Sequence, residues 1–273
     1  MDLGLDGVHV LVTGASGGIG FETTKHFLDH GACVTAHYNT GPGPLKDLEK
    51  TADNLKLVQA DVTEEKMVEH LFEQAGRAFG TEVEVLVVNH GIFLPEDVQL
   101  VDMGIEQWKR TLDVNLTGPF LLVREFLRRI REPREYYVPN LSKISVVAVG
   151  STSGEFGEAG HIDYACSKAA LQSGFIRTVK NEIVKIAPMG RINAVSPGWV
   201  LTAMAQRILA DPMVFQREIA TTPLKKVANV TEIASQILFL ASSKVSGHIT
   251  GQNVVVAGGM EGSLLNMPTA SEG

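Results

Sequence analysis

Residues 9–20, His-Val-Leu-Val-Thr-Gly-Ala-Ser-Gly-Gly-Ile-Gly, decide the fold of this chain. The apolar run 9–12 predicts a buried strand, and residues 19–30 have helical periodicity that stops at Gly31. A strand, a glycine-rich turn and a helix N-terminus form the usual anion cradle of dinucleotide-binding sheets, because free backbone N–H groups and the helix dipole face the phosphates. This stretch therefore predicts a dinucleotide site at the end of the first strand.

Each glycine of this turn has its own expected role. Gly14 allows the tight turn, Gly18 lets the backbone approach a pyrophosphate, and Gly20 lets the helix pack closely against the strand. The spacing Gly-x3-Gly-x-Gly differs from the common G-x-G-x-x-G, and the Gly-Lys-Ser/Thr of a P-loop is absent from it. The turn thus favours a dinucleotide over the triphosphate of an ATPase.

Apolar runs and helical stretches alternate along the rest of the chain. Strands that are apolar on both faces and alternate with helices predict a Rossmann-type α/β fold, a doubly wound parallel sheet of about seven strands with helices on both faces. Without a linker between halves, we expect one domain over residues 1–262 and a polar tail over 263–273. The expected strands are 9–12, 33–36, 57–60, 83–88, 144–149, 192–195 and 253–256, and the expected helices are 19–30, a short one within 42–54, 64–79 capped by Thr63 and Gly80, 106–131, 163–186 and 231–240, with a surface loop at 131–143.

Composition excludes several classes of protein. The 273 residues include 31 acidic and 24 basic side chains, a net charge of −7, which argues against nucleic acid and anionic membrane surfaces as partners. No apolar run approaches the roughly 20 residues of a membrane span. The acidic N-terminus is unlike a signal peptide, and Cys33 and Cys166 lie in apolar stretches as expected of buried thiols, so we expect a cytoplasmic protein.

The end of the second strand bears on the choice of dinucleotide. The ribose is usually read there, and the residues are His37, Tyr38, Asn39 and Thr40, without Asp or Glu to accept from a 2′-hydroxyl. The missing carboxylate removes a repulsion against a 2′-phosphate and favours NADP(H). No Arg is present there either, so NAD(H) stays open.

A Tyr-x-x-x-Lys pair opens the helix expected from residue 163. Tyr164 and Lys168 are four residues apart and share one helix face, and a nearby cation stabilises tyrosinate. Ser151 follows the fifth expected strand, at the carboxyl edge where such sheets bind ligands. Alone, the pair is more simply a solvated helix face; with the glycine turn and Ser151 it predicts general acid–base chemistry.

Together these motifs resemble the short-chain dehydrogenase/reductase family, in its compact single-domain type, similar to its 3-oxoacyl-carrier-protein reductase and carbonyl reductase members. The resemblance covers about residues 5–262. It rests on Thr13-Gly-x3-Gly-x-Gly20, Asp61-Val62, Asn89-His90-Gly91, Val114-Asn115, Ser151, Tyr164-x-x-x-Lys168, Pro197-Gly198 with Thr202, Pro223-Leu224, Thr250-Gly251-Gln252 and Gly258-Gly259.

The resemblance implies roles for individual residues. Tyr164 would be the general acid/base, Ser151 would polarise the substrate carbonyl, Lys168 would hold the nicotinamide ribose and lower the Tyr164 pKa, and Asn115 would support a water of the proton relay. No metal is expected. The implied cofactor-binding residues are Gly14, Ser16, Gly17, Gly18, Ile19, Gly20, Tyr38, Asn39, Asp61, Val62, Asn89, Gly91, Tyr164, Lys168, Pro197, Gly198, Val200 and Thr202.

The family's substrate pocket maps onto mostly apolar residues, so we expect a hydrophobic ketone or secondary alcohol. His161 is either a polar contact to the substrate or an exposed loop residue, and the Met and aromatic residues of 204–215 are most simply core contacts of a covering helix. The expected pocket residues are Phe93, Leu94, Phe156, His161, Trp199 and Met204.

Two departures from the family pattern stand out. His90 stands where the family has Ala, and we interpret it as a packed structural residue; Ala257 replaces an Asp before Gly258-Gly259.

The resemblance also implies an assembly. Family members are usually tetramers paired through the helices matching 106–131 and 163–186, so a homotetramer or homodimer is expected.

The leading hypothesis is an NADP(H)-dependent ketone reductase or alcohol dehydrogenase that transfers hydride between nicotinamide and a carbonyl. One alternative is an epimerase or dehydratase of the same family, although such relatives generally have a longer C-terminal domain. The other is a non-catalytic dinucleotide sensor or scaffold, which the presence of Ser151, Tyr164 and Lys168 disfavours.

Overall fold

The structure, a computed structural model, describes residues 2–134, 137–202, 205 and 210–262. Seven strands form one parallel sheet in the order β3-β2-β1-β4-β5-β6-β7. The predicted doubly wound fold is thereby confirmed. The strands are β1 (His9–Val12), β2 (Cys33–Tyr38), β3 (Leu55–Gln59), β4 (Val85–Val88), β5 (Ser145–Val149), β6 (Arg191–Pro197) and β7 (Asn253–Val256).

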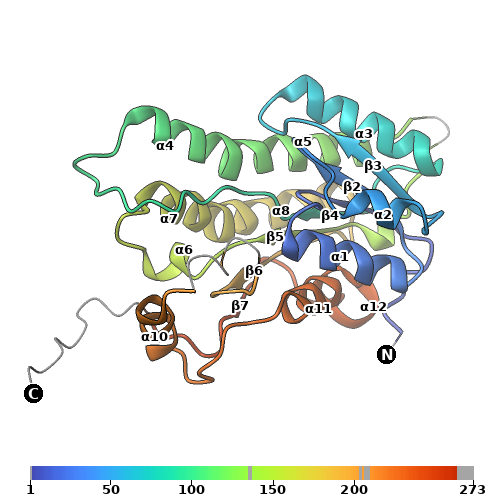
Figure 1. The fold of residues 1–273 in the computed structure, drawn as a ribbon. Coiled ribbons are helices and arrows are strands. Elements are labelled where there is room, and N and C mark those ends of the chain that lie inside the picture. Colours follow the sequence, from blue (N-terminus) through green and yellow to red (C-terminus); the bar gives the residue numbers. More distant parts are fainter. Residues whose placement is uncertain (1, 135–136, 203–204, 206–209, 263–273) are drawn as a thin grey trace, which may run out of the picture.

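Helices cover both faces of the sheet (Figure 1). On one face lie α3 (Glu65–Phe79), α4 (Ile105–Leu112), α5 (Gly118–Arg131), α7 (Ile162–Ala169) and α8 (Ile176–Ile186). The other face carries α1 (Gly18–Asp29), α2 (Leu45–Glu49), α11 (Val230–Ala241) and α12 (Ser243–Ser246). Two apolar cores result, one under each helix layer, and the strands supply residues to both. Burial on two sides explains why the central strands read as continuous apolar runs.

The strand order reverses between β1 and β4, since the chain moves outward through β2 and β3 and returns to the centre. In sheets of this type ligands bind in the crevice at the carboxyl ends of the strands, at such a reversal. The turn after β1 and the loops after β4, β5 and β6 therefore meet at one edge.

Most expected boundaries differ from the structure by one to three residues, and one expected cap is wrong. α3 is preceded by Glu64 as its N-cap, without a side-chain bond. The Thr63 hydroxyl donates instead to Asp61 Oδ1, at 2.7 Å, as does the Thr63 amide, at 2.9 Å. Asp61 thus engages the hydroxyl that would have capped the helix. Gly80 ends α3 in the left-handed conformation, as predicted.

Each of the two long expected helices contains a π-helical segment. Asp113–Thr117 joins α4 to α5, and Ala170–Phe175 joins α7 to α8. One extra residue in a turn rotates the following helix face, and such segments are frequent at functional sites. Sequence periodicity over a long window does not register this local change.

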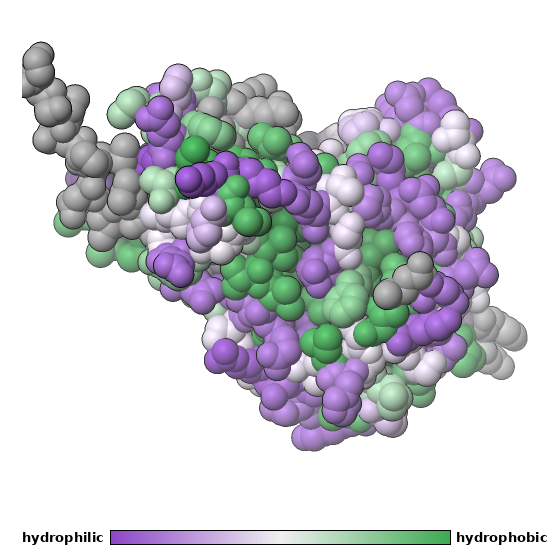
Figure 2. All heavy atoms as spheres, turned by 90° about the horizontal axis from the view of Figure 1, so that it is seen from below, coloured by the Kyte–Doolittle hydropathy of each residue, from purple (hydrophilic) through white to green (hydrophobic). Residues whose placement is uncertain are grey.

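Three expectations about exposure are corrected by the structure. Cys166 is exposed and Cys33 is half-buried, so neither is a core thiol, and both are free. In α10 (Pro212–Ala220), Met213 and Phe215 are 62% and 36% exposed, so they are not core contacts. Figure 2 shows hydrophobic residues gathered among hydrophilic ones on the face that carries α10, α11 and α12.

The described part of the expected surface loop at 131–143 is mainly irregular, with a 3-10 turn at Leu141–Lys143. A short helix, α6 (Ser153–Phe156), occupies the loop after β5 and was not expected. Within the described ranges, no helix has both the length and the hydropathy needed to cross a bilayer.

Candidate active site

The glycine turn after β1 is held in shape by close contacts at Gly14 and Gly20 that leave no room for a side chain at these two positions. Gly14 has φ +61°, a conformation that glycine adopts without strain. A Cβ on Gly20 would lie 2.3 Å from the Gly14 carbonyl oxygen and 2.6 Å from Asn89 Nδ2. Asn89 Nδ2 donates to the carbonyl oxygens of Thr13, at 3.0 Å, and Gly14, at 3.1 Å. Asn89 therefore ties the loop after β4 to the turn, which explains its place beside the expected cofactor site.

Two histidines, His37 and His90, support the turn through hydrogen bonds. His37 Nδ1 accepts from the Gly14 amide at 3.2 Å, and its Nε2 lies 3.0 Å from the Ala60 carbonyl oxygen. His90 Nδ1 lies 2.9 Å from Thr13 Oγ1 and His90 Nε2 donates to the Val114 carbonyl oxygen at 3.1 Å. Burial lowers the pKa of His37, and it lowers that of His90 to about 3, so both rings are neutral.

His90 is thus the packed structural residue that its position predicted. The role of His37 was missed, although a histidine inside an apolar strand was a signal for a buried hydrogen-bonding function. The turn residues Ser16, Gly17 and Gly18 are the ones that reach solvent, at the N-terminus of α1.

The residues expected near the adenosine lie at the ends of β2 and β3. Tyr38 is half-buried and Asn39 is exposed, and the Asn39 carbonyl oxygen accepts from Gln59 Nε2. Val62 is buried, and Asp61 uses its carboxylate on Thr63. No Asp or Glu stands at the end of β2, as the sequence indicated.

Ser151, Tyr164 and Lys168 come together at the carboxyl edge of β5. Lys168 Nζ donates to the Val149 carbonyl oxygen at 2.8 Å, which draws α7 against the end of that strand. The same Nζ lies 5.7 Å from the centre of the Tyr164 ring. The Ser151 amide donates to Gln172 Oε1 at 2.9 Å, and the Ser196 hydroxyl donates to the same oxygen at 3.1 Å.

Gln172 is therefore a buried anchor for Ser151 that the sequence reading missed. It lies in the π-helical segment, eight residues after Tyr164 and four after Lys168, and that helical spacing was the available signal.

The protonation state of the pair differs from the expectation. Burial raises the pKa of Tyr164 to about 12, the Ser151 hydroxyl acts in the opposite direction, and the charge of Glu158 raises it further. Burial also lowers the pKa of Lys168 to about 8. A lowering of the Tyr164 pKa by Lys168 is thus not found in this structure, where desolvation dominates.

Asn115 lies in the π-helical segment before α5 and is fully buried. Its Oδ1 accepts from the Ile92 amide at 2.8 Å and its Nδ2 donates to the Ile92 carbonyl oxygen at 2.9 Å. A Cβ on Gly91 would lie 3.3 Å from Asn115 Oδ1 and 3.4 Å from Lys168 Nζ. The amide of Asn115 therefore holds the loop after β4 against the active-site lysine.

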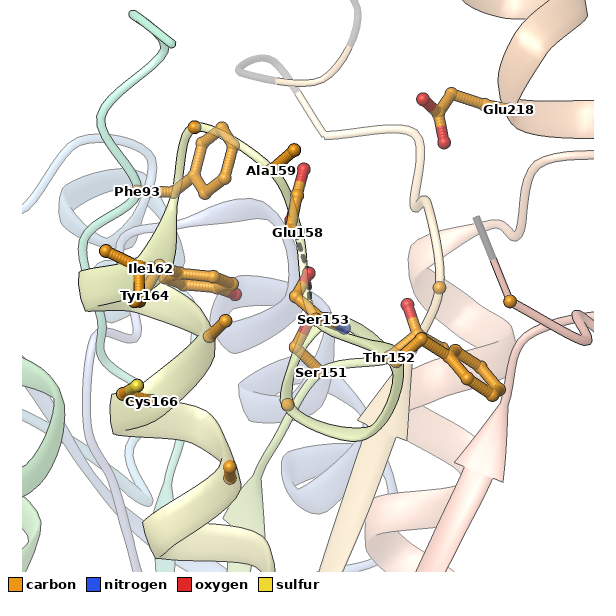
Figure 3. Close-up of a pocket in the computed structure, with 18 of the residues that line it drawn as sticks. Phe93, Ser151, Thr152, Ser153, Glu158, Ala159, Ile162, Tyr164, Cys166 and Glu218 are labelled. Atoms are coloured by element: carbon orange, nitrogen blue, oxygen red, sulfur yellow. Dashed lines mark hydrogen bonds between the residues drawn. The ribbon is translucent and has the colours of Figure 1, made fainter. Parts of the chain in front are cut away.

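Two cavities open beside these residues. The smaller, about 220 Å³, lies between the glycine turn and the Ser151–Tyr164 wall, and its lining includes Ile19, Asn89, Gly91, Tyr164, Lys168, Pro197, Gly198, Val200 and Thr202. The larger, about 840 Å³, lies above Ser151 and Tyr164. Figure 3 shows Phe93 and Tyr164 on one side of it, with Glu158 above Ser153 and Glu218 of α10 opposite.

The expected pocket residues divide into three groups. Phe93, Phe156 and Trp199 line the larger cavity. Leu94 and His161 are not among the lining residues, and Met204 lies outside the described residues. His161 is 5% exposed and pairs with Asp97 at 2.9 Å, so it is not an exposed loop residue. A polar contact between His161 and the substrate stays a prediction.

The cavity also has charged lining residues that the sequence reading missed, namely Glu158, Arg217 and Glu218. Trp199 Nε1 donates to Glu218 Oε2 at 2.5 Å, which holds α10 over the cavity. Burial raises the pKa of Glu218, and the Trp199 bond acts in the opposite direction.

The arrangement fits a nicotinamide dinucleotide. Gly91 lines the smaller cavity, and a Cβ there would lie 3.3 Å from Asn115 Oδ1 and 3.4 Å from Lys168 Nζ, so a side chain would crowd these groups. That cavity reaches Tyr164 and Lys168 at one end and Thr202 at the other. Among the described residues, no cluster of His, Cys, Asp and Glu that could hold a metal ion is present.

Comparisons with known proteins agree with this reading. A family model described as enoyl-(acyl carrier protein) reductase matches residues 14–261. The 3-oxoacyl-acyl-carrier-protein reductase FabG of Vibrio cholerae is 31% identical over 258 residues, covering 94% of this chain and 99% of the relative. The crystal structure of gox2181 has a TM-score of 0.85 at 27% identity, covering 95% of this chain and 97% of that one.

A crystal structure titled short-chain dehydrogenase/reductase, glucose/ribitol dehydrogenase, from Brucella melitensis has a TM-score of 0.79 at 25% identity and covers 96% of this chain and 99% of that one. The chain belongs to the short-chain dehydrogenase/reductase family, within the group that the matching model describes. It is an oxidoreductase that transfers hydride between a nicotinamide dinucleotide and a carbonyl or alcohol. The predicted family, fold, reaction class and type of cofactor are confirmed.

Proposed function

We propose that this protein is an NADP(H)-dependent ketone reductase in which Tyr164 donates the proton, Ser151 polarises the carbonyl and Lys168 holds the nicotinamide ribose. The observation that carries this is that all three residues line the smaller cavity, while Ser151 and Tyr164 also line the larger one. When bound, the reduced nicotinamide supplies the hydride for the carbonyl carbon.

The chain's own residues supply the proton and the orientation. With a pKa of about 12, Tyr164 is protonated at neutral pH and is ready to act as an acid. Gln172 fixes the backbone of Ser151 through its amide, at a place where Ser151 lines both cavities. Asn115, in this proposal, supports a relay water beside Lys168 in addition to clamping Ile92.

The test of this mechanism is Tyr164→Phe. Removal of the acidic hydroxyl should reduce turnover by at least about 100-fold, because general acid catalysis contributes about that much or more. Dinucleotide binding, followed by quenching of tryptophan fluorescence, should survive. Unchanged turnover would refute the mechanism, while loss of binding together with a lower melting temperature would indicate misfolding and call for Tyr164→Trp as the second variant.

We infer a preference for NADP(H) from the end of β2, where no carboxylate faces the site. The remaining cofactor-binding residues in this proposal are those at the turn and the strand ends named above. Titration with NADPH and NADH decides the matter. A hundredfold preference for NADH would overturn the inference.

For the substrate, we propose a ketone with an apolar body, such as a 3-oxoacyl thioester. The relatives named 3-oxoacyl-acyl-carrier-protein reductase support this class, as do Phe93, Phe156 and Trp199 in the cavity. A second candidate is a polyhydroxylated ketone, because the carboxylates of Glu158 and Glu218 accept hydrogen bonds from hydroxyl groups and one related structure is titled glucose/ribitol dehydrogenase.

Ethyl acetoacetate, fructose and acetophenone, each tested with NADPH, separate these substrate classes. Activity confined to fructose would favour the polyhydroxylated class and refute the apolar one.

We also propose a homodimer or homotetramer built on α5 and α8. A hollow of about 820 Å³ on these helices is lined largely by apolar side chains, including Phe120, which is 44% exposed. Burial of such a face between copies would explain it. Analytical ultracentrifugation of the protein and of Phe120→Glu tests this: a wild-type monomer refutes it. The cytoplasmic location stays a prediction.

A further inference from the structure

A hydrogen-bonded chain runs from Ser151 away from the reacting centre to a carboxylate. Ser151 Oγ donates to Ser153 Oγ at 3.1 Å, and Ser153 Oγ donates to Glu158 Oε2 at 2.5 Å. The Ser153 amide also donates to Ser151 Oγ, at 3.1 Å. Ser153 is the first residue of α6, and Glu158 lies between α6 and α7, above Ser153 (Figure 3).

The direction of this chain follows from counting protons. An ionised carboxylate only accepts, so the single proton of the Ser153 hydroxyl goes to Glu158. Ser153 Oγ is then left to accept, and the single proton of Ser151 goes to Ser153. The Ser151 hydroxyl therefore points its proton away from the place where it would polarise a carbonyl.

We propose that Glu158, acting through Ser153, sets the direction of the Ser151 hydroxyl and is a positioning residue for ketone reduction. This rests on the role of Ser151 in the proposed function. When Glu158 is ionised, a carbonyl gains the Ser151 hydrogen bond only by breaking the one to Ser153. When Glu158 is protonated, its own O–H donates to Ser153, Ser153 donates to Ser151, and Ser151 donates to the substrate.

Protonated Glu158 thus aligns the O–H groups of Glu158, Ser153 and Ser151 toward the carbonyl, and hydrogen bonds in such a chain strengthen one another. The charge of the ionised form also acts on its surroundings, since it raises the pKa of both Tyr164 and Glu218. The titratable and charged groups that line the cavity with Glu158 are Tyr164 and Cys166 of α7 and Arg217 and Glu218 of α10. Glu155 of α6 lies three residues before Glu158, and His161, the N-cap of α7, pairs with Asp97 of the loop after β4.

Glu158→Gln tests the proposal, with kcat/KM for NADPH-dependent reduction measured against pH on ethyl acetoacetate and on fructose. In the wild type, kcat/KM should be about 3- to 10-fold higher at acid than at neutral pH, the worth of one redirected hydrogen bond. Without the carboxylate charge this rise should vanish, and kcat/KM at neutral pH should approach the acid value of the wild type.

Two further variants make the result specific. Ser153→Ala breaks the chain and should also abolish the rise, and the double variant should show no more than either single one, because both remove the same coupling. Glu155→Gln removes an exposed carboxylate of α6 that is not part of the hydrogen-bonded chain. This variant should keep the wild-type pH profile of kcat/KM. Melting temperature and NADPH titration identify any variant that fails to fold.

A wild-type pH profile in Glu158→Gln, or additive effects in the double variant, overturns the proposal. Loss of the rise in Glu155→Gln as well would mean a general surface-charge effect and overturns it too. Absence of turnover with both probes in the wild type would instead refute the ketone reductase function, so the two failures are distinguishable.

Discussion

Gly20→Ala should destabilise the protein even though Ala favours helices. Gly20 lies in the first turn of α1, where Ala instead of Gly would gain at most about 1 kcal/mol from helix propensity. The new Cβ would lie 2.3 Å from the Gly14 carbonyl oxygen and 2.9 Å from Ala15 Cα, so the backbone of the turn must move. These atoms have little freedom, since Asn89 bonds the Gly14 oxygen at 3.1 Å and His37 bonds the Gly14 amide at 3.2 Å.

Overpacking of this kind costs up to about 3 kcal/mol. With the propensity gain subtracted, we expect a net loss of about 2 kcal/mol, which lowers the melting temperature of a chain this long by about 5 °C. The assay is thermal unfolding followed by circular dichroism, together with NADPH titration, in which the displaced turn should weaken binding at least tenfold.

Gly17→Ala is the matched control for folding. Its Cβ would lie 3.5 Å from the same Gly14 oxygen, an ordinary contact, so its melting temperature should stay within about 1 °C of the wild type. An unchanged melting temperature in Gly20→Ala, or equal losses in both variants, would refute the argument from close packing.

Three other predictions follow from buried groups. Arg191→Met should lower the free energy of unfolding, measured in urea titrations, by about 3 kcal/mol. The reason is that the guanidinium donates to the carbonyl oxygens of Leu240, at 2.7 Å, and Ala241, at 2.9 Å, at the end of α11. An unchanged free energy of unfolding would contradict this. Gln172→Leu leaves the Ser151 amide without its acceptor, so the free energy of unfolding should fall by about 1–3 kcal/mol and kcat should fall as well. Full activity of this variant would show that Ser151 needs no anchor. Burial lowers the Lys168 pKa from 10.5 to about 8. Between these two pH values the unfolded chain binds one proton more than the folded chain, so the free energy of unfolding should rise with pH across this window, by about 3 kcal/mol. Lys168→Met should lack this part of the slope in urea titrations at several pH values, and a slope equal to that of the wild type would contradict the assignment.

The local elements were predictable because their signals are local. β1 and β7 have the expected bounds, and the turn at Gly14 and the end of α3 at Gly80 have the positive φ that glycine was expected to supply. Burial of the central strands on two faces left a plain apolar pattern in the sequence. Helix periodicity places Tyr164 and Lys168 on one face, and the glycine turn together with Ser151 singled the pair out as a candidate site.

The substrate cavity was less predictable, since it is built from loops and from α10. Phe93, Phe156 and Trp199 were found by resemblance, whereas Glu158 and Glu218 reach the cavity from segments separated by about sixty residues, and no local pattern joins them. His161 was misread because its partner, Asp97, is in a different loop.

The sequence by itself determined the order of strands and helices, the dinucleotide turn and the presence of Ser151, Tyr164 and Lys168. Only the tertiary structure decided how these groups are protonated and where their hydrogen bonds point. Desolvation raises the pKa of Tyr164 to about 12, and Glu158 draws the Ser151 proton away through Ser153. Burial and hydrogen-bond direction depend on which segments surround a group in space, and that follows from packing rather than from spacing along the chain.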